Sequence, residues 1–361
     1  CTAELDGQTV AFHANEECLV KLDAPHLWSP EDPYLYPVTV TAGADRIESY
    51  FAMRCVCVRA DEHGVKRLFL NDAPLFQTGL LDQGYWPDGL YTAPADEAMI
   101  FDIQTAKDMG FNMLRKHIKI EPMRWYYHCD RLGMLVWQDM MNGGGKYKTS
   151  TISFPLFTGR NHREGNYHRF ARENGLCREE YRAELSEMVS QLRNVPCIVV
   201  WVPFNEGWGQ FDAADAVRRI TALDPDRLID HASGWHDQGI GELESLHVYF
   251  KRYRYRPDRL GRAVVLSEFG GYALALAGHT WEEKDFGYKK FADEDALQKG
   301  VTSLYEEQIL PAAVSGLCAT VYTQLSDVEE EVNGIVTYDR RVVKLDAAEM
   351  RRLNKRLTAK E

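Results

Sequence analysis

Eight short apolar runs recur along the chain from about residue 61 onward, and segments with helical spacing separate them. The runs are 75–80, 113–116, 134–140, 198–204, 228–232, 246–250, 263–269 and 319–325. Apolar runs of this length are typical of strands buried on both faces of a parallel sheet. Eight such strands that alternate with helices predict an α/β fold of the (β/α)8 barrel type.

Six of the intervening segments carry helix start and stop signals, such as an acidic first turn or a glycine after the last apolar position. They are 96–109, 121–132, 179–193, 212–223, 293–313 and 345–359. The segments after the fifth and sixth runs show no clear helix. The alternative fold is a doubly wound open sheet, which usually has a glycine-rich phosphate loop after its first strand. Residues 79–81 read Gly-Leu-Leu and lack that loop, which favours the barrel.

The first sixty residues have a different pattern, in which short β-branched and aromatic runs alternate with turn signals such as Ser-Pro-Glu-Asp-Pro at 29–33. This pattern predicts a β-sandwich domain over 1–60, followed by a barrel domain over 61–361. Because sixty residues are few for a complete sandwich, we expect this domain to be truncated at its start.

Composition excludes several classes of partner. Lys and Arg number 42 against 54 Asp and Glu, so the net charge is −12, and such a chain repels nucleic-acid phosphates. No apolar stretch reaches the about 18 residues of a membrane span, so we expect no membrane insertion. The 8 cysteines lack metal-ligand or C-x-x-C spacing, which favours reduced thiols and a cytoplasmic location. A periplasmic or secreted location and an oligomeric state are left open.

Two glutamates end apolar runs. Glu206 follows the fourth run and Glu268 lies at the end of the seventh. The carboxyl ends of barrel strands meet at one mouth, so the two side chains can converge. A carboxylate there is costly unless it is used or paired, and the alternative interpretation is an ion pair with an arginine. A pair of carboxyl groups is what glycoside hydrolysis requires, one protonated and one ionised.

The neighbours of the two glutamates suggest different roles. Glu206 precedes Gly207 and Trp208, and an apolar ring together with a nearby carboxylate disfavours its charged form, as a general acid requires. Arg115 ends the second run and is the candidate partner that favours the charge of Glu268.

Several motifs together resemble glycoside hydrolase family 2, which includes β-galactosidases, β-glucuronidases and β-mannosidases. Residues 202–210, VPFNEGWGQ, resemble the acid/base motif of that family, and 267–270, SEFG, resemble its nucleophile strand. Residues 110–115, GFNMLR, resemble its second-strand signature. Residues 27–36, LWSPEDPYLY, resemble the immunoglobulin-like domain that precedes its barrel.

This resemblance implies a retaining mechanism in which Glu268 is the nucleophile and Glu206 the acid/base. It implies that Asn205 binds the 2-hydroxyl of the sugar, and that Tyr249 is the family tyrosine near the nucleophile, although a core tyrosine is the alternative. His247 is a further candidate to reach substrate, or a structural hydrogen-bond donor. No cofactor is required by any cluster of residues, while Mg²⁺ or Na⁺ accompanies some members of the family.

The remaining substrate contacts are expected from loops. The loop after the first run offers a polar edge and an aromatic ring, so we expect Asp82 and Trp86 to touch the sugar, the alternative being a rim loop with a buried tryptophan. Gln324 occupies the position where relatives usually have a tryptophan. Residues 330–334, EEVNG, replace the Asn-x-Lys pair of glucuronidases, and their acidic character disfavours a uronate substrate.

Together these features predict a retaining exo-β-glycosidase that acts on a carbohydrate substrate, with β-galactosidase as the expected specificity. A β-mannosidase or another family 2 specificity is the alternative among enzymes. A catalytically inactive sugar-binding barrel is the alternative of another class, although a binding protein needs no carboxyl pair. The basic run 251–256, KRYRYR, is interpreted as a solvated loop, a contact with another domain, or a contact with an anionic glycan.

Overall fold

The computed structural model describes residues 1–282 and 285–359, and a parallel eight-stranded barrel is its centre. In chain order the barrel strands are β8 (Gln77–Asp82), β9 (Met113–Lys116), β10 (Leu135–Asp139), β11 (Ile198–Val202), β12 (Leu228–Ile229), β13 (Leu243–Val248), β14 (Ala263–Gly270) and β17 (Leu317–Thr323). Each overlaps one of the eight apolar runs, so the predicted barrel is confirmed. The sheet order β12-β11-β10-β9-β8-β17-β14-β13 leaves β12 and β13 as its two ends, and the barrel is therefore nearly closed.

Seven of the eight barrel strands are buried on both faces, whereas burial alternates along β13. All residues of β8, β9, β10, β11, β14 and β17 are buried. Large rings such as those of Trp137 and Trp201 are fully buried in this core. Burial of one such ring stabilises the fold by several kcal/mol, since truncating a core Trp typically costs about 3–5 kcal/mol.

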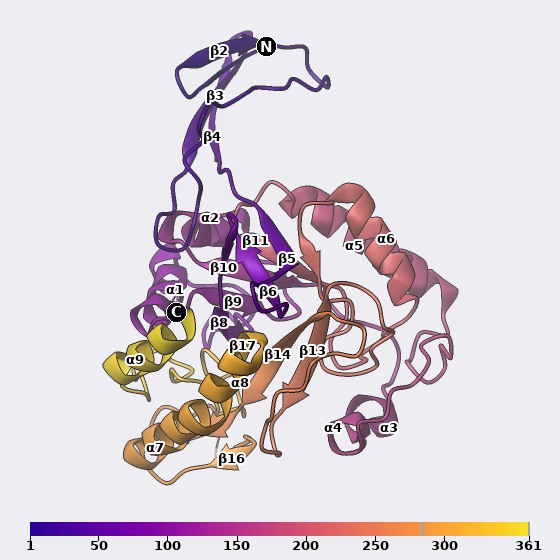
Figure 1. Ribbon diagram of the computed structural model, residues 1–361, viewed down its shortest axis with the longest axis vertical. Helices are drawn as coiled ribbons and strands as arrows, with labels where there is room; N and C mark the ends of the chain where they lie inside the picture. Colours follow the sequence, from indigo (N-terminus) through magenta and orange to yellow (C-terminus); the bar gives the residue numbers. More distant parts are fainter. Residues whose placement is uncertain (283–284, 360–361) are drawn as a thin grey trace.

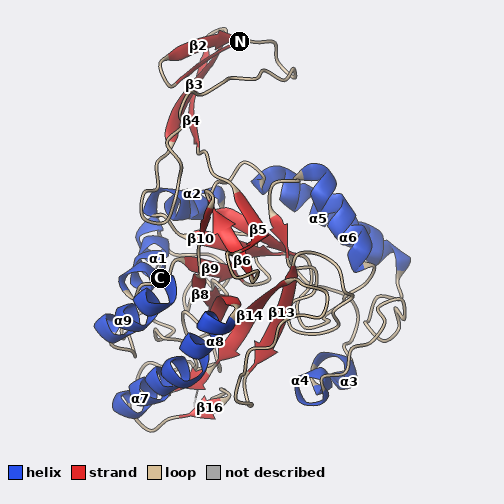
Figure 2. Cartoon of the chain, viewed as in Figure 1, coloured by secondary structure: helices blue, strands red, loops and turns tan. Residues whose placement is uncertain are grey.

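Helices surround the barrel (Figures 1 and 2). They are α1 (Asp96–Asp108), α2 (Met123–Leu132), α5 (Gly175–Leu192), α6 (Ala213–Leu223), α7 (Glu294–Leu304), a π-helical turn η1 (Tyr305–Ile309), α8 (Leu310–Ser315) and α9 (Ala347–Thr358). These elements confirm the six predicted helical segments. No helix follows β12 or β13, because 230–242 and 249–262 are irregular. The long loop 142–174 between β10 and α5 contains two short helices, α3 (Thr149–Ile152) and α4 (Phe154–Thr158).

The N-terminal residues form an antiparallel sheet that projects from the barrel (Figure 1). Its strands are β1 (Thr2–Leu5), β2 (Gln8–Ala11), β3 (Tyr36–Ala42) and β4 (Asp45–Phe51), in the order β2-β1-β3-β4. A second antiparallel sheet follows, made of β5 (Val56–Ala60), β6 (Lys66–Leu70) and β7 (Ala73–Pro74), and it packs against the barrel strands. The predicted boundary between residues 60 and 61 falls inside the hairpin of β5 and β6. A short parallel pair, β15 (Tyr272–Ala273) and β16 (Lys289–Lys290), lies after β14.

The N-terminal sheet is joined to the barrel through Asp130 of α2. The indole N–H of Trp28, a fully buried residue, donates to the Asp130 carbonyl at 2.8 Å, and the Tyr50 hydroxyl donates to its carboxylate at 2.7 Å. The other carboxylate oxygen accepts the backbone N–H of Cys197, just before β11, at 2.7 Å. Arg54 donates to the carbonyls of Pro196 and Ile198 in the same region. The joint therefore lies at the amino ends of the barrel strands, opposite the mouth where Glu206 and Glu268 are expected.

Within the part of the chain that the structure describes, no helix combines the length and the apolar character that crossing a bilayer demands.

Candidate active site

Glu206 lies on a tight turn that follows β11. Glu206 and Gly207 both adopt the left-handed region, with φ of 52° and 71°. A Cβ atom on Gly207 would lie 2.4 Å from Cδ2 of His236, so this position needs glycine. The Glu206 N–H donates to the Ser233 carbonyl at 2.9 Å, and the Trp235 indole donates to the Glu206 carbonyl at 2.7 Å. The backbone that carries this carboxyl group is thus held from two sides.

The structure brings Glu206 and Glu268 together. Glu268 lies in β14, and its carboxylate, that of Glu206 and a ring nitrogen of His247 have ligand atoms within 4.8 Å of one another. This close approach of one oxygen from each group is consistent with the about 5–5.5 Å between the carboxyl groups of retaining glycosidases.

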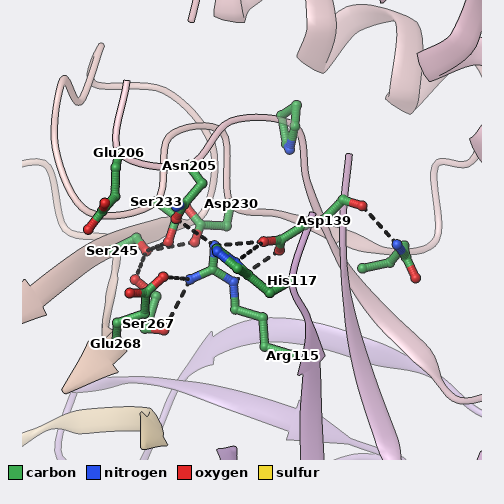
Figure 3. A network of polar contacts seen from close by, with 12 residues as sticks. Arg115, His117, Asp139, Asn205, Glu206, Asp230, Ser233, Ser245, Ser267 and Glu268 are labelled. Atoms are coloured by element: carbon green, nitrogen blue, oxygen red, sulfur yellow. Dashed lines mark hydrogen bonds and ion pairs between the residues drawn. The ribbon is translucent and has the colours of Figure 1, made fainter. Parts of the chain in front are cut away.

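Arg115 at the end of β9 supplies the charge partner of Glu268. Its Nη1 lies 3.2 Å from Glu268 Oε1 and donates to the Ser267 carbonyl at 3.1 Å, while Nε and Nη2 contact Asp139 at 3.0 and 2.9 Å (Figure 3). Burial alone would lower the pKa of Arg115, but the two carboxylates outweigh burial and raise it. A permanently cationic guanidinium beside Glu268 favours the ionised form that a nucleophile needs.

Tyr249, just after β13, contacts the other side of the nucleophile. Its hydroxyl donates to Glu268 Oε2 and lies 3.2 Å from Thr323 Oγ1. Its ring stacks on Tyr288 with centroids 3.7 Å apart and an interplanar angle of 6°. Burial and the neighbouring Glu268 raise the pKa of Tyr249 well above its usual range, so the phenol stays protonated as a donor.

His247 bridges the two carboxyl groups. Its Nδ1 lies 2.8 Å from Glu206 Oε1 and 3.5 Å from Glu268 Oε2, and its Nε2 lies 3.0 Å from the Ser233 hydroxyl. Burial lowers the pKa of His247 well below its usual range, and Arg115 adds to this effect. The ring is therefore neutral and orients the carboxyl group of Glu206 without adding a charge.

Burial raises the pKa of Glu206 well above its usual range, and the charge of Glu268 raises it further. The sequence predicts that the Trp208 ring contributes to this raised pKa. In the structure, however, the ring of Trp208 contacts His117 and Tyr147. Trp235, which packs against the His247 ring with centroids 5.5 Å apart, is the tryptophan whose indole reaches Glu206. The surroundings thus hold a proton on Glu206, as a general acid requires.

Asn205 is oriented by Arg115. Its Oδ1 accepts a hydrogen bond from Arg115 Nη2 at 2.8 Å, and the residue is 2 % exposed. Because the amide oxygen is occupied, the amide Nδ2 is the group that Asn205 can offer to a sugar hydroxyl, which agrees with the predicted role.

The structure places Asp82 and Trp86 in structural contacts. Asp82 lies at the end of β8 and pairs with Lys116 Nζ at 2.6 Å, and Lys116 also pairs with Glu121 at 2.9 Å. Trp86 is 5 % exposed, and the Arg340 guanidinium covers its ring at 4.1 Å from the centroid. These positions favour the alternative of a rim loop with a buried tryptophan over a contact with sugar.

Gln324, directly after β17, is fully buried and belongs to a row of polar side chains. Its Nε2 donates to Glu331 Oε2 at 2.8 Å and to Asn333 Oδ1 at 2.9 Å, and its Oε1 accepts from Gln83 at 2.8 Å. Hydrogen-bonded polar side chains therefore occupy the position where relatives in the family usually have a tryptophan.

Sequence reasoning missed several residues of this site, which Figure 3 shows around Arg115. Asp139 ends β10, and Asp230 follows β12, where its carboxylate accepts from Ser245 at 2.6 Å. A carboxylate at the end of an apolar run was the signal that identified Glu206 and Glu268, and it marks these two aspartates equally. His117, which lies 3.1 Å from Asp139, is two residues beyond Arg115.

Among the residues that the structure describes, one group of His, Cys and carboxylate side chains is close enough to hold an ion. It consists of Glu206, His247 and Glu268. The same three groups form the carboxyl pair and its bridge, so they do not fit a separate resident ion. No step of the reaction proposed below passes through the Mg²⁺ or Na⁺ that accompanies some members of the family.

A parallel barrel with a close pair of differently surrounded carboxyl groups at its mouth has the architecture of a barrel glycosidase. Residues 92–356 match the family model "Glycosyl hydrolases family 2, TIM barrel domain". Residues 2–54 match the family model "Glycosyl hydrolases family 2". The chain belongs to glycoside hydrolase family 2.

Individual relatives differ in the sugar that their names give. A β-galactosidase of Pectobacterium atrosepticum is 27 % identical over 229 residues, which are 62 % of this chain and 20 % of that protein. The chain thus spans a small part of the curated relatives that it matches. A β-galacturonidase structure from Eisenbergiella tayi has a TM-score of 0.70 at 20 % identity, over 98 % of this chain and 65 % of that one. A β-glucuronidase structure from an uncultured Clostridium has a TM-score of 0.71 at 16 % identity, over 98 % and 62 %.

Proposed function

We propose that this chain carries the catalytic centre of a retaining exo-β-glycosidase that removes terminal β-linked sugars, with β-galactosides as the expected substrates. One observation carries the proposal. One carboxyl oxygen of Glu206 and one of Glu268 lie within 4.8 Å of each other; the surroundings of Glu206 favour its proton, and Glu268 lies beside the Arg115 guanidinium.

The first step follows from these positions. A carboxylate oxygen of Glu268 attacks the anomeric carbon and forms a glycosyl ester, while the bond from that carbon to the leaving oxygen breaks. Glu206 transfers its proton to the leaving oxygen. Arg115 and Tyr249 orient Glu268, and Asn205 donates to the 2-hydroxyl, where binding strengthens in the transition state.

The second step uses the same groups in the opposite direction. Glu206, now a carboxylate, takes a proton from water, and the water oxygen attacks the anomeric carbon. The ester bond to Glu268 breaks, so Glu268 returns to its carboxylate form and the sugar is released with its original β configuration.

A β-glycuronidase is the second candidate, because the similar structures named above are a β-galacturonidase and a β-glucuronidase. A proton NMR time course with the 4-nitrophenyl β-glycosides of galactose, mannose and glucuronic acid distinguishes the candidates. The expected result is turnover of the galactoside with the β-anomer as the first product. Release of the α-anomer first contradicts retention, and sugar binding without turnover supports an inactive barrel. The matched control is Glu268→Gln, which keeps the shape of the site.

A further inference from the structure

A third carboxylate, that of Glu331, lies at the mouth of the barrel and takes no part in the reaction described above. It belongs to the loop after β17 and is partly buried. The loop fixes its backbone: the Glu331 N–H donates to the Val328 carbonyl at 2.9 Å, and the Val328 N–H donates back at 3.0 Å. A parallel bridge with Phe286 holds its other side. The side chain therefore starts from a rigid position.

Two neutral amides hold the carboxylate of Glu331. Gln324 Nε2 and Gln83 Nε2 both donate to the same oxygen, Oε2, at 2.8 and 3.0 Å. Gln83 follows β8 and Gln324 follows β17, so both donors come from the carboxyl ends of neighbouring barrel strands. The second oxygen, Oε1, accepts no hydrogen bond from the residues that the structure describes.

A short chain of contacts places Glu331 on the side of the nucleophile. Thr323 directly precedes Gln324, and its hydroxyl lies 3.2 Å from the Tyr249 hydroxyl, which donates to Glu268. Burial raises the pKa of Glu331, and the charge of Glu268 adds to the effect, although His117 and the two amides oppose it. Glu331 in turn contributes to the raised pKa of Glu206.

The cations near the mouth already have partners. Arg115 pairs with Asp139 and Glu268, and Lys116 pairs with Asp82 and Glu121. Among the residues that the structure describes, the side chain of Glu331 bonds to the two amides and to no cation. The two amide hydrogen bonds to Oε2 favour the ionised form of Glu331 and oppose the effect of burial. An ionised carboxylate accepts hydrogen bonds only, so it binds hydroxyl groups of a sugar and repels a second carboxylate at close range.

We propose that Glu331 determines which sugars enter the site: its open oxygen accepts a hydrogen bond from a hydroxyl of a neutral terminal sugar, and its charge excludes uronic acids. This inference rests on the proposed function, because it concerns the sugar that the same carboxyl pair attacks. It commits the enzyme to neutral glycosides, in contrast to the similar structures named for uronides.

The experiment compares two substrates that differ only at C6, 4-nitrophenyl β-galactoside and 4-nitrophenyl β-galacturonide. We expect the wild-type protein to have the higher kcat/KM on the galactoside, and we expect this preference to fall at least tenfold in Glu331→Gln. The matched control is Glu329→Gln, which removes the same charge from an exposed position two residues away and leaves the preference unchanged. Gln83→Met, which removes one of the two amide donors, shifts the preference in the same direction by less.

A binding measurement keeps the inference separate from the proposed function. Titration of galactose and of galacturonic acid, followed by saturation-transfer NMR, needs no turnover. A preference for galactose that is lost in Glu331→Gln supports the inference even if no substrate is hydrolysed. Wild-type protein that binds or cleaves the uronic acid as well as the neutral sugar overturns the inference, and so does an unchanged preference in Glu331→Gln, while the proposed glycosidase activity stands if the β-anomer is released.

Discussion

The surroundings of Glu268 and of Glu206 differ although the two carboxyl groups are close neighbours. Glu268 contacts a buried guanidinium and the Tyr249 phenol, both of which donate to a negative charge. Glu206 contacts a neutral imidazole, and burial together with the charge of Glu268 keeps its pKa high. The fold thus gives the two carboxyl groups different surroundings: two donors contact Glu268, whereas burial beside a second carboxylate raises the pKa of Glu206.

The largest effect is expected from removing the nucleophile. Glu268→Ala leaves no group that can form the glycosyl ester, so we expect kcat to fall by more than about 10⁴-fold on every aryl glycoside. The measurement is steady-state release of nitrophenol, with circular dichroism to show that the variant folds. A loss of less than about tenfold would contradict the assignment of Glu268.

Removal of the general acid, Glu206, is expected to lower the rate by an amount that depends on the leaving group. Glu206→Ala removes the proton donor, so we expect a loss of about 10²–10⁴-fold on alkyl glycosides. On 2,4-dinitrophenyl glycosides the loss in the glycosylation step is far smaller, because that leaving group needs little protonation. A Brønsted plot of glycosylation rate against the pKa of the leaving group measures the difference. An equal loss on all substrates contradicts the role of Glu206 as acid.

The hydrogen bonds that Arg115 donates can be weakened while its positive charge is kept. Arg115→Lys retains a cation but cannot contact Asp139, Glu268 and Asn205 at once, because a lysine has no planar fork of donors. We expect kcat/KM to fall by about 10–10²-fold. The control is Arg124→Lys, an exposed change on α2. Wild-type kinetics in Arg115→Lys would show that charge alone, without the fork, is sufficient to prepare Glu268.

The smallest effect concerns pH. Glu206 acts as an acid in its protonated form, so kcat/KM is lost as the pH rises through its raised pKa. Glu331 contributes to that raised pKa, and Glu331→Gln therefore moves the basic limb of the profile to lower pH, by up to about one unit. The pH dependence of kcat/KM is the measurement, with Glu329→Gln as control. A shift to higher pH contradicts the sign of the interaction.

The barrel could be predicted because short apolar runs overlap its strands and alternate with helical segments; β11 is the clearest such run. The lack of helices after β12 and β13 agrees with the unclear pattern there. Glu206 and Glu268 could be predicted because an acidic residue that ends such a run is conspicuous.

Other contacts depend on pairings between distant residues that a linear sequence does not contain. Asp82 ends a run in the same way, but its pairing with Lys116 of the next strand gives it a structural role. Glu331 becomes part of the mouth only because loops after β8 and β17 meet. The sequence does show that residues 330–331 are acidic, and only the fold shows that the charge of Glu331 acts on both Glu206 and Glu268.

The joint between the N-terminal sheet and the barrel affects which parts of the sequence can vary independently. It consists of contacts from Trp28, Tyr50 and Arg54 to α2 and the start of β11. The N-terminal sheet is attached at the start of β11, whereas Glu206 follows the end of the same strand. Mutation or engineering can therefore diversify the loops of the mouth while the joint stays intact. Equally, a different sheet can be grafted onto the joint without displacing the catalytic carboxyl groups.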